Sequence, residues 1–287
     1  MLVLDLGVLS RRPHTVELRE ALGWSAAWIL LAVAFASSLF FWHGRAEALQ
    51  FVTGYVIELT LSVDNLFLFL VIFRYFNVPP EHQHKVLFFG VLGALVMRGL
   101  FIAAGVSLML RFEWVTYAFG ALLIYSGLKL FRQREQRIDP SRNPLLRVFR
   151  RILPITSQYE GGRFFTRKDA LYATPLFVVL LVVETSDILI AVDSVPAVLA
   201  ITLNAFIVYT SNVFAILGLR SMYFALAQMM DRFHYLHYGL SVVLILIGLK
   251  MISSHYISVP TEWALGTTLA VLAASVVASL IASRHTL

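Results

Sequence analysis

The chain has 287 residues, of which 59% are apolar and 14% are charged, with a net charge of +6 and a mean hydropathy of +0.78. Soluble domains contain roughly 45–50% apolar residues, so this composition indicates a membrane protein and argues against a soluble fold. Because the sequence contains no cysteine, disulfides, thiolate metal sites and thiol redox chemistry are excluded.

Apolar stretches recur along the whole chain at lengths that suit a membrane. A helix of about 20 apolar residues spans the hydrocarbon core of a bilayer. The stretches predict an all-α polytopic membrane protein with about eight transmembrane helices. No basic region precedes the apolar start of the chain, so we do not expect a signal peptide. The predicted spans are 23–42, 49–73, 86–110, 114–131, 171–199, 205–228, 237–255 and 262–282.

These spans divide the chain into five parts. An N-terminal segment with the first full transmembrane helix (1–48) is followed by a three-helix unit (49–131). A basic loop (132–170) leads to a second three-helix unit (171–255) and then to a C-terminal transmembrane helix (256–287). Two units of equal helix number on either side of one loop indicate an internal repeat.

The basic loop determines the predicted orientation of the helices. Eleven of the 23 Lys and Arg residues fall between Lys129 and Lys168. Loops rich in Lys and Arg stay on the cytoplasmic side of a membrane, so we predict that this loop is cytoplasmic and consider nucleic-acid binding the less favoured explanation. Within it, RNPLLRVFRRILP (142–154) is typical of an amphipathic helix, lying either on anionic lipid or on the protein's own cytoplasmic face.

The two three-helix units share three sequence matches in the same order. Each unit contains an odd number of helices, so the second must enter the membrane from the opposite side. This is the inverted repeat of many secondary transporters, whose substrate site lies near the midplane between the repeats. The matches are IELTLSVDNLF (57–67) with SDILIAVDSVP (186–196), VLGALVMRGLFIA (91–103) with VFAILGLRSMYFA (213–225), and GLK at 127–129 and at 248–250.

Charged residues occupy matched positions in the two units. The alignment places Glu58 on Asp187, Asp64 on Asp193, Asn65 on Ser194, and Arg98 on Arg220. With Glu184, five acids fall inside predicted spans, where a charge costs about 2.5–3.5 kcal/mol on insertion scales. Pairing with Arg98 and Arg220 is the structural explanation, and we expect each guanidinium to contact an acid of a central cluster. Two cations cannot neutralise five acids, and the excess charge can bind protons or a metal ion, so we predict a cation path.

The predicted ligands are hard oxygen atoms, which suit Mn, Mg or Ca better than Zn or Cu. Asp64 and Asp193 are the expected first ligands because they occupy matched positions, and Glu184 and Asp187 follow as ligands or proton carriers. We expect Pro196 to break or kink its helix and so to free a backbone carbonyl. The predicted metal-site residues are Glu58, Asp64, Asn65, Glu184, Asp187 and Asp193, supported by Arg98, Arg220, Ser194 and Asn212.

Histidine is not expected among the ligands. The histidines nearest to the spans on the cytoplasmic side fall in predicted loops, where solvated side chains are the simplest interpretation. Metal collection or pH sensing is the alternative role for them. These histidines are His82, His84, His234 and His237.

Three segments resemble the signatures of the TerC/Alx family of bacterial integral membrane proteins: TGYVIELTLSVDNLFLF, ATPLFVVLLVVETSDILIAVDSVPAV and FIVYTSNVFAILGLRSMYFALA. The resemblance covers about residues 3–280. It implies a multi-pass protein of the bacterial inner membrane that exports divalent cations, with manganese the leading ion, in a superfamily that includes the lysine exporters. The family's acidic motif residues carry over to Glu58, Asp64, Asn65, Glu184, Asp187 and Asp193.

The chain departs from the family pattern in two places. Family members carry a further apolar helix that ends in the segment reading LVLDLGVLSRRPH here, which leaves open whether such a helix precedes this chain. They also have Asp-Pro where this chain has Asn204 and Ala205, in a predicted outer loop. The first departure leaves the repeats untouched, and the second affects only a local turn.

Other functions remain open beside export. Part of the family is named for tellurite resistance, but an acid-rich site repels an oxyanion, so that resistance would be indirect, through metal balance. A membrane factor that loads metal into other proteins or assembles them would use the basic loop as its partner surface. No nucleophile with a base is evident, so we expect no enzyme and no cofactor apart from the transported ion. The expected partners are a divalent cation, the lipid bilayer, and either a second copy of the chain or a membrane partner, but no nucleic acid.

Overall fold

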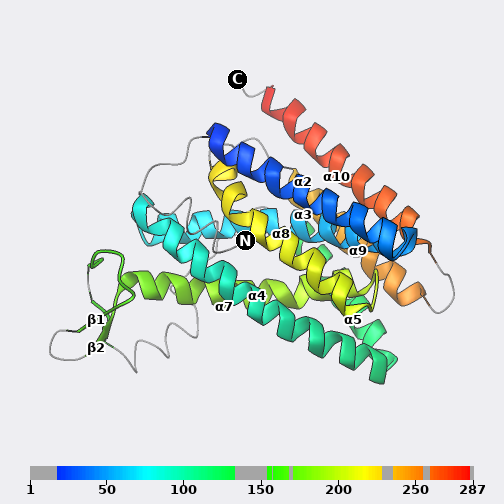
Figure 1. Cartoon of the computed structure of the whole chain (residues 1–287), viewed down its shortest axis with the longest axis horizontal. Helices are drawn as coiled ribbons and strands as arrows, with labels where there is room; N and C mark the ends of the chain where they lie inside the picture. The colour runs from blue at the N-terminus through cyan, green and yellow to red at the C-terminus, as the bar shows by residue number, and fades with distance from the viewer. Residues whose placement is uncertain are drawn as a thin grey trace.

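The computed structural model describes residues 18–132, 154–156, 158–167, 171–227, 235–254 and 259–284. This part of the chain is a bundle of long helices with one short hairpin (Figure 1). The helices are α2 (Leu18–Trp42), α3 (Arg45–Tyr75), α4 (Pro80–Arg111), α5 (Trp114–Arg132), α7 (Pro175–Leu199), α8 (Ala205–Ala227), α9 (Leu236–Ser253) and α10 (Thr261–Arg284). The hairpin pairs β1 (Phe165–Arg167) with β2 (Leu171–Ala173).

Seven helices in the described part are long and apolar enough to cross a membrane. The remaining one, α8, has a shorter apolar stretch, Ala205–Leu219, and packs against α2, α3 and α4. The prediction of an all-α polytopic membrane protein is therefore confirmed. The helix bounds also follow the predicted spans closely for α5, α8, α9 and α10.

Helices α3 and α4 are longer than the spans predicted for them. They contain 31 and 32 residues, which is about 47 Å of helix at 1.5 Å per residue, against a hydrocarbon core of about 30 Å. The turn between them is short because Asn77 adopts a left-handed conformation (φ 49°), which Asn tolerates better than most residues. His82 and His84 therefore lie in the first turns of α4 and not in a loop.

Helix α7 begins later than predicted and does not break. Residues 171–173 form β2, and the helix begins at Pro175, where the missing N–H of proline would have no helical partner. The helix then runs unbroken to Leu199 with Pro196 inside it. The expected break at Pro196 is therefore wrong, because the loss of one backbone hydrogen bond is tolerated near the end of a well-packed helix.

The helix pairs that pack between the two three-helix units correspond to one another. α3 packs against α8 as α4 packs against α7, and α5 packs along α9. Exchanging α3 with α7, α4 with α8, and α5 with α9 leaves this set of pairs unchanged. An internal repeat of two three-helix units would give this exchange, and the inversion of the second unit stays a prediction.

The α5–α9 crossing shows the same relation at single residues. A Cβ on Gly248 would lie 2.7 Å from the carbonyl oxygen of Gly120, and a Cβ on Gly127 would lie 2.8 Å from that of Ser241. In the GLK alignment Gly127 corresponds to Gly248, and Gly120 to Ser241, so each contact is the counterpart of the other. Small residues at these positions let two membrane helices approach closely.

Asn204 caps the start of α8, at the position where the sequence departs from the Asp-Pro pattern. The side-chain oxygen of Asn204 accepts hydrogen bonds from the backbone N–H groups of Phe206 (3.1 Å) and Ile207 (3.5 Å). Asn is among the best residues for capping the first free N–H groups of a helix. The substitution therefore leaves the turn before α8 intact.

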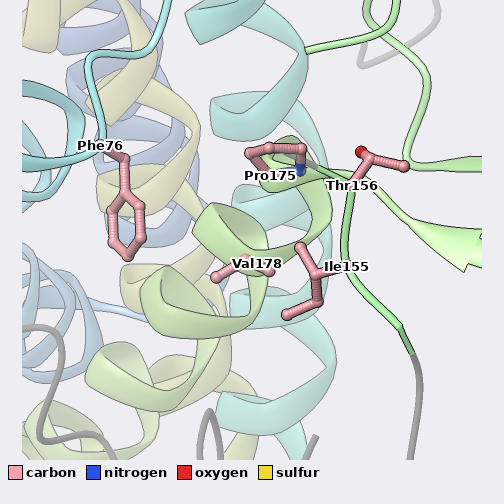
Figure 2. A pocket seen from close by; sticks show the side chains of 5 residues that line it. All are labelled: Phe76, Ile155, Thr156, Pro175 and Val178. Carbon is pink, nitrogen blue, oxygen red and sulfur yellow. The ribbon is translucent and has the colours of Figure 1, made fainter. Parts of the chain in front are cut away.

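The described end of the basic loop folds onto the bundle. The hydroxyl of Tyr159 donates to the carbonyl of Phe76 at the end of α3 (2.7 Å), and Lys85 of α4 donates to the carbonyl of Gly162 (2.7 Å). Thr174 donates to the carbonyl of Arg163 (2.6 Å), which ties the strand β2 back to the loop. A pocket of about 400 Å³ lies beside this segment, and Figure 2 shows the side chains that line it. It is lined by Phe76, Ile155, Thr156, Pro175 and Val178. The predicted amphipathic helix at 142–154 lies almost wholly outside the described residues.

We expect Tyr159→Phe to loosen this segment. Burial raises the pKa of Tyr159 above its ordinary value, so the phenol stays protonated and keeps donating its hydrogen bond at neutral pH. Its loss costs about 1 kcal/mol, or roughly a fivefold increase in local opening. Trypsin cleavage at Arg163 and Arg167 should accelerate by that factor, whereas Tyr117→Phe on the exposed face of α5 should leave it unchanged. Equal cleavage rates in both variants would contradict the docking.

Introduced cysteines can test the predicted orientation because the chain contains none. Glu113, between α4 and α5, and Gln158, in the docked segment, are both exposed. A membrane-impermeant thiol reagent added to intact cells should label Glu113→Cys and spare Gln158→Cys until the cells are opened. Labelling of both from one side would contradict the topology.

Candidate functional site

A buried ion-pair cluster joins four helices at the middle of the bundle. Arg98 of α4 forms ion pairs with Glu58 of α3 and with Asp187 of α7, in the latter case over 3.7 Å from Nη2 to Oδ1. The Nη1 of Arg98 also donates to the side-chain oxygen of Asn212 of α8 (2.9 Å). Arg98 is 1% exposed, Glu58 0%, Asp187 5% and Asn212 1%. The expectation that Arg98 contacts an intramembrane acid is confirmed, and the side chain of Arg220 lies outside the described set.

This central cluster (Glu58, Arg98, Asp187 and Asn212) forms a polar layer between two apolar cores. On α4, Arg98 falls between Ala94 of one core and Ile102 of the other. Asp187 of α7 likewise falls between Val183 and Ala191, and Asn212 of α8 between Ile216 and Val208. Glu58 of α3 lies between Ile57 and Leu61, both of the second core. Water is therefore displaced on both sides, which strengthens the electrostatic interactions within the layer.

The cluster contains more negative than positive charge. Two carboxylates share one guanidinium, so the ionised cluster carries one excess negative charge. A buried charge without compensation costs several kcal/mol. The excess therefore has to be neutralised by a proton or by a further cation.

Several polar atoms beside the cluster have no hydrogen-bond partner among the described atoms. Glu58, Ser62 and Asn65 follow one another at helical spacing along one face of α3, and all three are buried. Asp187 and Ser194 do the same along α7, at the positions that the repeat alignment matches. The atoms concerned are Glu58 Oε2, Ser62 Oγ, Asn65 Nδ2, Asp187 Oδ2 and Ser194 Oγ. Four of the five are oxygen atoms that could ligate a hard cation.

Asp193 lies apart from the central cluster, unlike the single site that we expected. It follows Asp187 by six residues, which is about 9 Å along the helix, and its Oδ1 accepts a hydrogen bond from Ser126 of α5 (2.6 Å). The ammonium of Lys129 lies close enough to attract this carboxylate. The described contacts of Asp187 and Asp193 are thus made with different helices. Neither Ser126 nor Lys129 was predicted as a partner, although their i, i+3 spacing puts both on one face of α5.

Asp64 lies on the opposite side of the cluster from Asp193. It follows Glu58 by six residues on α3, and α3 runs antiparallel to α7, because Phe76 at the end of α3 and Pro175 at the start of α7 line one pocket. The backbone of Asp64 is thus about 9 Å from Glu58 toward the hairpin, and that of Asp193 is about 9 Å from Asp187 away from it. The side chain of Asp64 is outside the described set. The acids therefore occupy three levels along the bundle.

Glu184 occupies a notch on the hairpin side of the cluster. It precedes Asp187 by three residues on α7, and a Cβ built on Gly93 of α4 would overlap its carboxylate. A larger residue at Gly93 would therefore displace this carboxylate from its present position. The sequence carried no signal that would have singled out Gly93 for this role.

The described side chains do not form a ready-made metal site. Among them, no group of three or more Asp, Glu or His side chains is close enough to hold a metal ion. Asp64 is absent from that set, and the guanidinium of Arg98 lies between Glu58 and Asp187.

Residues 43–287 match the integral membrane protein TerC family. The chain belongs to this family. An uncharacterized membrane protein of Myxococcus xanthus is 50% identical over 99% of this chain and 90% of its own length. Alx of Escherichia coli strain K12, named as a candidate membrane-bound redox modulator, is 44% identical over 95% of this chain and 88% of its own length. No solved structure matches this TerC family member.

Proposed function

We propose that this TerC family protein is a secondary transporter of the bacterial inner membrane that exports divalent metal cations, with Mn²⁺ the leading substrate. The central cluster carries the proposal: two buried acids from matched positions of the two repeats share one guanidinium. A structural ion pair would need one acid for one arginine. The second acid is explained if a cation passes through the layer.

The ligand chemistry favours a hard divalent ion. The unpartnered buried oxygen atoms near Glu58 and Asp187 belong to carboxylates and hydroxyls, and the chain has no cysteine. Such oxygen sites suit Mn²⁺, Mg²⁺ and Ca²⁺. We assign Glu58 and Asp187 to the central part of the ion path. Asp64 then serves the part on the hairpin side, and Asp193 the part on the opposite side. Asn65, Ser194 and Asn212 supplement the carboxylates.

Exchange for protons is the proposed source of energy. Moving a divalent ion outward against an inside-negative potential costs about 4.6 kcal/mol per 100 mV, and the sequence contains no nucleotide-binding motif that could drive it. Exchange for two protons moves no net charge, and carboxylates such as Glu184 are suited to carry protons. A rate of Mn²⁺ export that does not change when a pH gradient is imposed would contradict this coupling.

Metal content of cells tests the proposal directly. Bacteria that lack their own manganese exporters should accumulate less Mn²⁺ when they express this protein than when they carry an empty vector. The same cells should survive higher external Mn²⁺. Unchanged manganese content, with the protein present in the membrane, would speak against export.

A membrane assembly factor is the second candidate. The hairpin exposes Phe165 and Leu171 on the predicted cytoplasmic side, and exposed apolar residues outside the membrane suit a protein partner. The redox role in the name of Alx belongs to that relative. Since this chain has no thiol, any redox effect or tellurite resistance would arise indirectly, through metal balance.

A further inference from the structure

The guanidinium of Arg98 lies where the proposed transport would place the ion. It contacts the carboxylates of Glu58 and Asp187 and the amide oxygen of Asn212, and these are the oxygen types that ligate divalent cations. A guanidinium and a metal ion cannot both lie between these oxygens, because like charges repel strongly in a buried layer. If the proposed function holds, Arg98 has to leave the site when the ion binds.

The ion pairs of Arg98 are incomplete in a way that favours displacement. The Nε and Nη2 of Arg98, Oε2 of Glu58 and Oδ2 of Asp187 have no hydrogen-bond partner among the described atoms. A buried ion pair contributes to stability only when its remaining donors and acceptors are satisfied. Displacing this guanidinium therefore gives up fewer interactions than displacing a fully bonded one.

A third acid, Glu184, lies on the hairpin side of the two that Arg98 contacts. Glu184 precedes Asp187 by three residues and so lies on the same face of α7, with its carboxylate against Gly93. Gly93 is five residues before Arg98 on α4. Long side chains on a helix extend toward its N-terminus, which is the direction from Arg98 to Gly93.

We propose that Arg98 is a tethered cation with two positions, which fills the central site in the absence of metal and moves to Glu184 when a divalent ion replaces it. The charges agree with this exchange. The carboxylates of Glu58, Glu184 and Asp187 carry three negative charges, and a divalent ion with the guanidinium carries three positive charges. The ion-bound arrangement is neutral with a divalent ion and remains negative with a monovalent one, so the exchange also selects for divalent ions.

Binding of Mn²⁺ to purified protein in detergent, followed by the loss of the free Mn²⁺ paramagnetic resonance signal, tests this inference. We expect Arg98→Gln to bind Mn²⁺ at least about tenfold more tightly than wild type, because coupling between close buried charges exceeds ~1.4 kcal/mol. Glu184→Gln should bind at least about tenfold more weakly, because the displaced guanidinium loses its second partner. In the double variant the effect of Glu184→Gln should disappear. If Glu184 acted only as a metal ligand, Glu184→Gln would still weaken Mn²⁺ binding in the double variant. That result would reject the inference.

A second pair of variants applies if Arg98→Gln fails to fold. Gly93→Ala displaces the Glu184 carboxylate without touching the ion pairs and should weaken Mn²⁺ binding. Gly90→Ala on the same helix, whose Cβ would meet Val183 at 3.2 Å, should not. Equal affinities in these two proteins would reject the tethered cation.

If the wild-type protein carries Mn²⁺ across liposomes but folded Arg98→Gln binds no more tightly, this inference fails and the proposed function stands. Wild-type protein that carries no Mn²⁺ rejects the proposed function itself.

Discussion

Replacing Glu58 by Gln, or Asp187 by Asn, is expected to abolish Mn²⁺ export while the protein remains folded in the membrane. Each substitution keeps the shape of the side chain and removes one charge. The central cluster then holds one acid for one arginine, so the remaining ion pair with Arg98 is balanced and no buried charge is left without a partner. A divalent ion, by contrast, loses a charged ligand in a dry layer, which costs about 2 kcal/mol or more and lowers transport at least ~30-fold.

The matched control is Glu47→Gln. It makes the same chemical change on the same helix, in the first turn of α3, eleven residues and so about 16 Å from Glu58. We expect it to export Mn²⁺ normally. Manganese content of cells and the amount of protein in the membrane are measured together. Full export by both Glu58→Gln and Asp187→Asn would show that the acids are structural.

Gly248→Ala is expected to give the largest loss of stability among conservative substitutions in the bundle. Its Cβ would lie 2.7 Å from the carbonyl oxygen of Gly120 and 2.9 Å from Cγ1 of Ile124. A backbone atom cannot turn away as a side chain can, so α5 and α9 have to separate. Overpacking of this kind costs about 1–3 kcal/mol, and it occurs where the two predicted repeats contact each other.

Gly266→Ala on α10 is the control for this substitution. Its Cβ would have no atom within 4 Å, while the change in helix propensity is the same as at Gly248. The midpoint of unfolding in mixed micelles should fall for Gly248→Ala and should not fall for Gly266→Ala, because the gain in helix propensity there meets no steric cost. A similar midpoint in both would mean that the α5–α9 contact is not close-packed.

Most of the fold could be predicted because a bilayer restricts the structures that can cross it. Apolar stretches of helical length give the spans, and the matched segments of the two units are consistent with the pairing of α3 with α8 and of α4 with α7. Arg98 was correctly expected to contact an acid, because a buried guanidinium needs one.

The division of the acids could not be predicted from spacing alone. Asp193 is six residues from Asp187, and only the position of α5 shows that Ser126 donates a hydrogen bond to its carboxylate. Glu184 likewise depends on a missing side chain at Gly93 of a different helix. The hairpin at 165–173 was missed because its strands contain three residues each, too few for an alternating pattern to be recognised.

The most direct test of the central claim is Mn²⁺ flux into liposomes that contain only this protein. A fluorescent metal indicator is enclosed in the vesicles, Mn²⁺ is added outside, and a proton gradient is imposed across the membrane. We predict saturable Mn²⁺ uptake above that of protein-free vesicles, and its loss with Glu58→Gln but not with Glu47→Gln. Uptake equal to that of protein-free vesicles would contradict transport and would leave the assembly factor as the better account of this protein.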